Sequence, residues 1–109
     1  MSKIAGLVAG LLVLPSVAVA QQPSPEFTIG WLNYSAGMIS QDLSVRNNGW
    51  RPIKTARIRC RFFHYSKQLG AGAVEIHNIA SNTVGYQTMT VASRTSPISA
   101  TCHMVSVTY

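Results

Sequence analysis

Residues 57–62 have the sequence Arg-Ile-Arg-Cys-Arg-Phe, and this strict alternation decides the fold. Successive side chains of an extended strand point to opposite faces of a sheet. The three arginines therefore share one face, and Ile58, Cys60 and Phe62 share the other. An unpaired arginine cannot lie in a dry core, so the arginine side faces solvent and the register is determined. We predict a strand over residues 53–65.

The same period of two recurs before this strand. Ile39, Leu43 and Val45 share one face of a strand over residues 39–46, which ends at Asn47-Asn48-Gly49 because Asn and Gly tolerate positive φ. An earlier strand over residues 27–34 carries alternating Phe27, Ile29 and Trp31.

Three further strands follow the arginine-rich strand. They are expected over residues 73–79, with Val74 and Ile76 in the core, over residues 84–92 and over residues 100–109. Residues 67–72 contain two glycines and are predicted to form a turn. About six strands with turn signals at short intervals, and no helical period, predict an antiparallel β-sandwich or barrel.

The first residues have the pattern of a cleaved signal peptide. Lys3 precedes an apolar run over residues 4–14, and Ala18-Val19-Ala20 forms an A-x-A cleavage site. The run is too short for a membrane-spanning helix. We expect a periplasmic or secreted protein cleaved after Ala20, with no transmembrane anchor, a flexible lead-in over residues 21–26 and one domain over residues 27–109.

Cys60 and Cys102 are the two cysteines of the chain, and export would place them in an oxidising compartment. They are predicted to form one disulfide. Closing the loop from residue 60 to residue 102 stabilises the fold by roughly 4 kcal/mol in the chain-entropy model. A bond from a middle strand to the last strand would hold two sheets face to face.

Charge limits the partners. The chain has nine Lys and Arg against three Asp and Glu, a formal net charge of +6, which falls by one when Lys3 is removed. This excess favours polyanions such as anionic lipid, lipopolysaccharide phosphates or acidic proteins, and it equally serves solubility. No nucleic acid is expected, because export separates the chain from most of it.

A family resemblance begins at Val45-Arg46-Asn47-Asn48-Gly49, followed by Pro52-Ile53-Lys54 and an alternating strand. This resembles the bacterial FxLYD-type domain, and the similarity runs from Ile39 to Val107, with Gly70-Ala71-Gly72 and Asn78-Ile79-Ala80 at the family's glycine turn and pre-strand break. The chain departs from the family at the name-giving motif, where it reads Cys60-Arg61-Phe62-Phe63-His64. The resemblance implies an exported, non-catalytic, immunoglobulin-like sandwich.

Catalytic and metal-binding patterns are weak. The carboxylates Glu26, Asp42 and Glu75 are scattered, and there is no nucleophile elbow or phosphate loop, so no catalytic residue and no cofactor is assigned. Cys102-His103-Met104 contains three metal-ligand types, but alternate positions on a strand face opposite ways, and Cys102 is expected in the disulfide. A surface His103 and a core Met104 are the simpler interpretation.

The arginines are the candidate binding residues. Arg57, Arg59 and Arg61 rise about 6.6–7 Å apart, a spacing suited to a row of phosphates or carboxylates, and Arg51 and Lys54 could widen the patch. A solvated face that blocks edge association explains them equally. Trp50, beside a turn, is the candidate contact aromatic.

Three functions remain open. The first is an exported accessory or binding module that recognises a protein or envelope component. The second is a polyanion-binding protein acting through the arginines. The third is a small periplasmic metal carrier.

Overall fold

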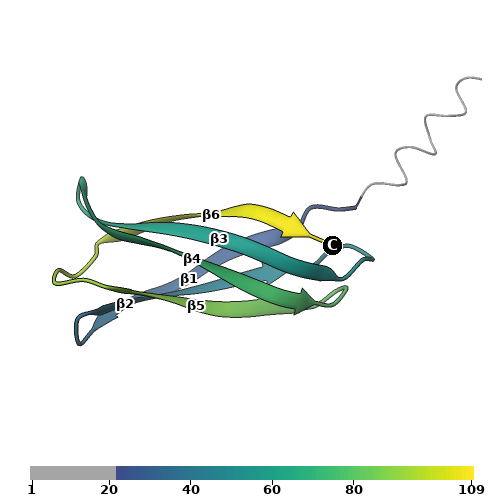
Figure 1. The fold of residues 1–109 in the computed structure, drawn as a ribbon, viewed down its shortest axis with the longest axis horizontal. Helices are drawn as coiled ribbons and strands as arrows, with labels where there is room; N and C mark the ends of the chain where they lie inside the picture. Colours follow the sequence, from purple (N-terminus) through teal and green to yellow (C-terminus); the bar gives the residue numbers. More distant parts are fainter. Residues whose placement is uncertain (1–21) are drawn as a thin grey trace, which may run out of the picture.

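Two three-stranded antiparallel sheets are stacked into a β-sandwich, in a computed structural model that describes residues 22–109 (Figure 1). The strands are β1 (Glu26–Ser35), β2 (Met38–Arg46), β3 (Ile53–His64), β4 (Lys67–Ile79), β5 (Val84–Ala92) and β6 (Ser99–Thr108). One sheet has the order β1-β2-β5 and the other β4-β3-β6. The predicted all-β sandwich is confirmed.

The strand order is that of an immunoglobulin-type sandwich. In such folds the first, second and fifth strands share a sheet, while the third and sixth pair in the other. Here β4 joins the sheet of β3 and β6, and it then crosses to β5 in the facing sheet. The strands run side by side along the domain, with hairpins and loops at its two ends (Figure 1).

The core lies between the two sheets and comes from alternate residues of the strands, as predicted. Ile58, Cys60 and Phe62 are at most 1% exposed, and the arginines between them are exposed. Ile76 is buried, whereas Val74 is only partly buried against the core. The buried set is Ile39, Leu43, Val45, Ile53, Ala56, Ile58, Cys60, Phe62, Ile76, Ile79 and Met89.

The turn predicted over residues 67–72 is wrong. These residues are the first part of β4, and the turn is the two-residue Tyr65-Ser66, with Tyr65 at φ 55°. Gly70 and Gly72 do not form a turn, and their lack of a side chain allows β4 to pack closely against the facing sheet. A Cβ added at Gly70 would lie 2.9 Å from Val91 Cγ1, and one at Gly72 would lie 3.1 Å from Met89 Sδ. Glycine within a strand often marks such a close approach.

The disulfide joins Cys60 and Cys102, as predicted, but it does not connect the two sheets. Cys60 on β3 lies directly opposite Cys102 on β6, its neighbour in the same sheet, with their Cα atoms 4.0 Å apart. Opposed residues on neighbouring antiparallel strands are this close because the ladder holds them in register. The expectation of a bond between facing sheets is therefore wrong.

The end of β2 is confirmed at Arg46, but its cause is different from the one expected. Residues 47–49 have no positive φ. Instead, the Asn47 side chain, 1% exposed, organises the loop. Its Nδ2 donates to the carbonyls of Arg51 (2.8 Å) and Ile79 (3.0 Å), and its Oδ1 accepts from the Gly49 amide (2.9 Å). These bonds replace the strand ladder and end the strand.

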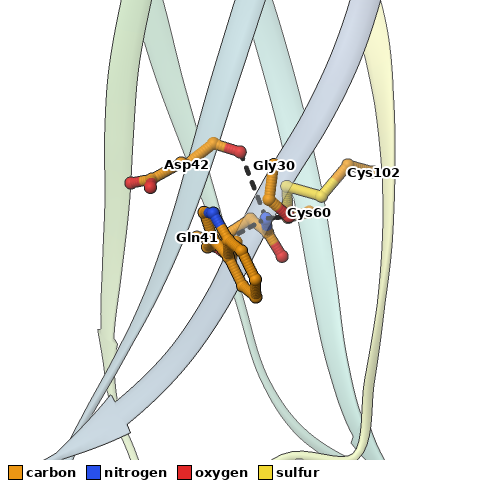
Figure 2. Close-up of a disulfide and its surroundings, with 6 residues drawn as sticks. Gly30, Gln41, Asp42, Cys60 and Cys102 are labelled. Atoms are coloured by element: carbon orange, nitrogen blue, oxygen red, sulfur yellow. Dashed lines mark hydrogen bonds between the residues drawn. A yellow bond between two sulfur atoms is a disulfide. The ribbon is translucent and has the colours of Figure 1, made fainter.

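A β-bulge interrupts β1 between Ile29 and Leu32. Trp31 is 76% exposed and Ile29 is 43% exposed, so of the predicted alternating residues Phe27, Ile29 and Trp31 only Phe27 packs against the core. The buried Gln41 of β2 stabilises the bulge: its Nε2 donates to the carbonyls of Gly30 (3.0 Å) and Trp31 (3.0 Å), and of Asp42 (3.1 Å) (Figure 2).

The predicted signal peptide, residues 1–20, and Gln21 lie outside the described residues. Within residues 22–109 no helix is long and apolar enough to cross a membrane. Of the expected lead-in, Gln22 contacts the loop after β2, because its Oε1 accepts a hydrogen bond from the Trp50 amide (2.9 Å).

Candidate functional site

The arginine face is the outer surface of sheet β4-β3-β6 around Arg57, Arg59 and Arg61, all three of which are exposed. Their places on this face follow from β3, whose intervening residues are held in the core. The cross-strand register sets their neighbours. Glu75, Ala73 and Ala71 lie opposite on β4, and Ser106, His103 and Thr101 lie opposite on β6.

One carboxylate offsets part of this charge. Glu75 Oε2 lies 3.3 Å from Arg57 Nη1, and Glu75 Oε1 lies 3.5 Å from His77 Nε2. The Arg57 and Glu75 side chains are 45% and 42% exposed, so this surface pair adds about 0–1 kcal/mol to stability at most. Within residues 22–109, Arg59 and Arg61 have no carboxylate partner. Their charge remains available to a ligand.

The small neighbours leave both of these arginines accessible. Ala73 and Ala71 cannot cover the guanidinium groups opposite them, and Thr101 is also short. The Arg61 guanidinium lies 5.9 Å from the centroid of the Phe63 ring, within the range of a cation–π contact. The arginine face therefore presents a short row of cations beside small side chains on β4, with His103 of β6 next to Arg59.

Arg51 and Lys54 do not share a hollow with these arginines. They line a depression of about 290 Å³ at the start of β3, together with Tyr109, whose ring centroid lies 5.4 Å from the Arg51 guanidinium. Arg57 borders a different depression with Glu75 and His77. The predicted five-residue patch is thus a row of three arginines with two cations beyond its end.

Trp50 is 56% exposed, in the loop between β2 and β3. The loop is fixed on both sides, because the Trp50 amide donates to Gln22 and the Ser81 hydroxyl donates to the carbonyl of Gly49. The candidate contact aromatic is therefore presented by a well-bonded loop, near Arg51 in sequence.

The residues weighed as metal ligands are separated. Cys102 is bonded to Cys60 and has no free thiolate. His103 lies opposite Arg59 on the outer face and is exposed, whereas Met104 lies opposite Ile58 and packs against the core. In the described part of the chain no three His, Cys, Asp or Glu residues come together.

A second surface feature was missed by the sequence reasoning. Asp42 on β2 borders a depression of about 420 Å³ on the outer face of sheet β1-β2-β5. It depends on Gly30 lying beside Asp42, and that register follows from the bulge in β1. The one sequence signal is a glycine next to Trp31 in a strand, which indicates a bulge but not its partner.

Comparisons with known proteins give little. No family model matches the chain, so the FxLYD-type resemblance stays a proposal, and no curated protein matches it either. Among solved structures, a crystal structure of a β-glucosidase from Kluyveromyces marxianus in complex with glucose is similar at a TM-score of 0.48 and 10% identity. That match covers 76% of this chain and 14% of the β-glucosidase chain. A similarity at this level assigns neither a family nor an activity.

Proposed function

We propose that the chain is an exported, non-catalytic binding module that contacts an anionic component of the cell envelope through its arginine face. The observation that carries the proposal is the pair Arg59 and Arg61, exposed on a rigid strand and without a carboxylate partner among the described residues. Arginine is suited to phosphate and carboxylate groups because its planar guanidinium donates two parallel hydrogen bonds.

The rest of the charge distribution supports this function. The excess of Lys and Arg over Asp and Glu attracts polyanions over a range of about 10 Å at moderate salt. Glu26, Asp42 and Glu75 lie on three different strands and are all exposed, which favours a binding role over acid–base catalysis. The proposed export and the FxLYD-type resemblance both support a location in the periplasm or outside the cell.

The experiment is salt elution of the purified protein from immobilised heparin, used as a polyanion, and from vesicles containing an anionic lipid. We expect the triple variant Arg57→Ala, Arg59→Ala, Arg61→Ala to elute at clearly lower salt from both. A matched variant removes three charges elsewhere, with Arg46→Ala, Lys67→Ala and Arg94→Ala. It should elute closer to the parent than the first triple variant does, because Arg46 lies on β2 in the other sheet, and Lys67 and Arg94 border a different depression, shared with Tyr34 and Ser93.

Equal shifts in the two triple variants would show that net charge alone determines retention, and the arginine face would then have no special role. Retention of the first triple variant at the parent's salt concentration would remove the proposal entirely. Thermal unfolding of each variant shows that the fold is kept, which is expected because every substituted side chain is exposed.

A further inference from the structure

The outer face of sheet β1-β2-β5 is chemically unlike the arginine face. Its central outward positions carry short polar side chains, one carboxylate and one exposed aromatic ring. The register places Thr28, Ser44 and Tyr86 in one row across the three strands, and Gly30, Asp42 and Thr88 in the next. These six residues line the depression of about 420 Å³.

The depression exists because Gly30 has no side chain. A Cβ added at Gly30 would lie 3.2 Å from the Cβ of Asp42. Any larger residue would crowd the aspartate and close the hollow. Tyr86 lies on β5, on the other side of Asp42 from Gly30. It is 76% exposed and lines the depression next to shorter side chains. The hollow is thus bounded by an aromatic ring on one strand and by a glycine on another.

Asp42 is held in place but is only partly used by the protein. Its Oδ1 accepts a hydrogen bond from Thr88 Oγ1 (3.0 Å), and no basic side chain of the described chain pairs with it. Figure 2 shows its carboxylate pointing away from Gln41 and from the disulfide, and so away from the core. The carboxylate has several acceptor sites, so it can accept further hydrogen bonds from a ligand.

We propose that this depression binds a neutral carbohydrate. Two neighbouring sugar hydroxyls can donate to the Asp42 carboxylate, while the hydroxyls of Thr28 and Ser44 donate or accept as needed. The Tyr86 ring can pack against the apolar C–H face of a pyranose and offers its own hydroxyl to water or ligand. A few placed polar groups beside an aromatic surface are typical of small-ligand sites.

Charge argues against the two other classes of ligand. An anion would be repelled by Asp42 at the centre of the hollow. A cation would pair with Asp42, but the positive net charge of the protein lowers the local concentration of cations. A neutral polyhydroxyl ligand suffers neither effect. This inference is independent of the anion-binding function proposed above and concerns the opposite face of the sandwich.

The test is titration calorimetry of the protein with three neutral tetrasaccharides, cellotetraose, maltotetraose and tetra-N-acetylchitotetraose, and with spermidine as the cationic probe. We expect saturable binding of at least one tetrasaccharide. The variants Asp42→Ala and Tyr86→Ala should each weaken it by at least about tenfold, because each removes a principal contact. Amide shifts in NMR spectra should be confined to residues around positions 28–31, 42–44 and 86–88.

Two matched variants control for nonspecific effects. Glu26→Ala removes a carboxylate from the same sheet, and Tyr65→Ala removes a ring that is 78% exposed in the β3–β4 hairpin. Both should bind like the parent. The proposal is overturned if no tetrasaccharide binds, if binding survives in both Asp42→Ala and Tyr86→Ala, or if spermidine alone binds through Asp42.

Discussion

Replacing Gln41 by leucine should destabilise the fold, although the two side chains have similar size. Gln41 is 1% exposed, and its Nε2 donates to the carbonyls of Gly30, Trp31 and Asp42. The first two carbonyls belong to the bulge of β1, where the ladder with β2 is out of register. Leucine fills the space but supplies no donor to these groups.

The magnitude follows from the number of groups left without a partner. A buried polar group without a hydrogen bond costs about 1–3 kcal/mol, so the two bulge carbonyls together cost about 2–6 kcal/mol. Burying leucine in place of an amide adds back about 1–2 kcal/mol to the free energy of unfolding. Because β1 is an edge strand, water reaches part of the bulge, and the cost stays below the upper limit, at about 3–4 kcal/mol. We expect a net loss of about 2 kcal/mol in the free energy of unfolding.

The measurement is urea unfolding followed by tryptophan fluorescence and by circular dichroism. The midpoint should fall while the slope with urea stays the same. The control is Gln87→Leu on β5, an exposed glutamine whose Nε2 donates to the Glu75 carbonyl (3.4 Å) and whose Oε1 accepts from the Thr88 amide (3.1 Å). It should change stability by no more than about 0.5 kcal/mol. A Gln41→Leu protein as stable as the parent would refute the role assigned to this amide.

Two further predictions concern packing and the loop after β2. Gly85→Ala should destabilise the domain by about 1–3 kcal/mol, measured by thermal or urea unfolding. The new Cβ would lie 2.6 Å from Cγ2 of the buried Ile76. Unchanged stability would mean that the two sheets can move apart at this position at little cost. Asn47→Ala removes three hydrogen bonds from a buried position and should cost about 2–3 kcal/mol. The control Asn48→Ala, which loses one exposed bond to Arg46, should be nearly neutral, and equal effects of both would contradict the role of Asn47.

The alternation of residues 57–62 predicted β3 correctly because the direction of a side chain on a strand depends only on its neighbours in sequence. The turn predicted from the glycines of residues 67–72 was wrong because the role of these glycines depends on residues far away in sequence. Two glycines close together in sequence are typical of a turn, and Gly70 and Gly72 fit that pattern. In the structure they lie within a strand and pack against Val91 and Met89 of the facing sheet. That contact depends on how β4 crosses to the facing sheet, which no local pattern contains.

Some features of the candidate site could likewise be predicted from a single strand, and others required the pairing of strands. The exposure of Arg57, Arg59 and Arg61 could be predicted from β3 alone, whereas the pairing of Arg57 with Glu75 needed the register between β3 and β4. The depression at Asp42 was missed because it requires a bulge in β1. The two cysteines of the sequence determined the disulfide pairing, but its position within one sheet required the strand order.

The position of the disulfide connects stability with the proposed binding surface. Cys60 lies between Arg59 and Arg61, and its partner Cys102 lies between Thr101 and His103, the residues opposite those two arginines. The covalent bond therefore fixes β3 to β6 at the centre of the arginine face, although both cysteines point into the core. A surface that is already ordered loses less conformational entropy when it binds a ligand. The spacing of Arg59 and Arg61 is set by β3 itself, and the disulfide adds a fixed position of these two arginines relative to His103 and Thr101 on β6.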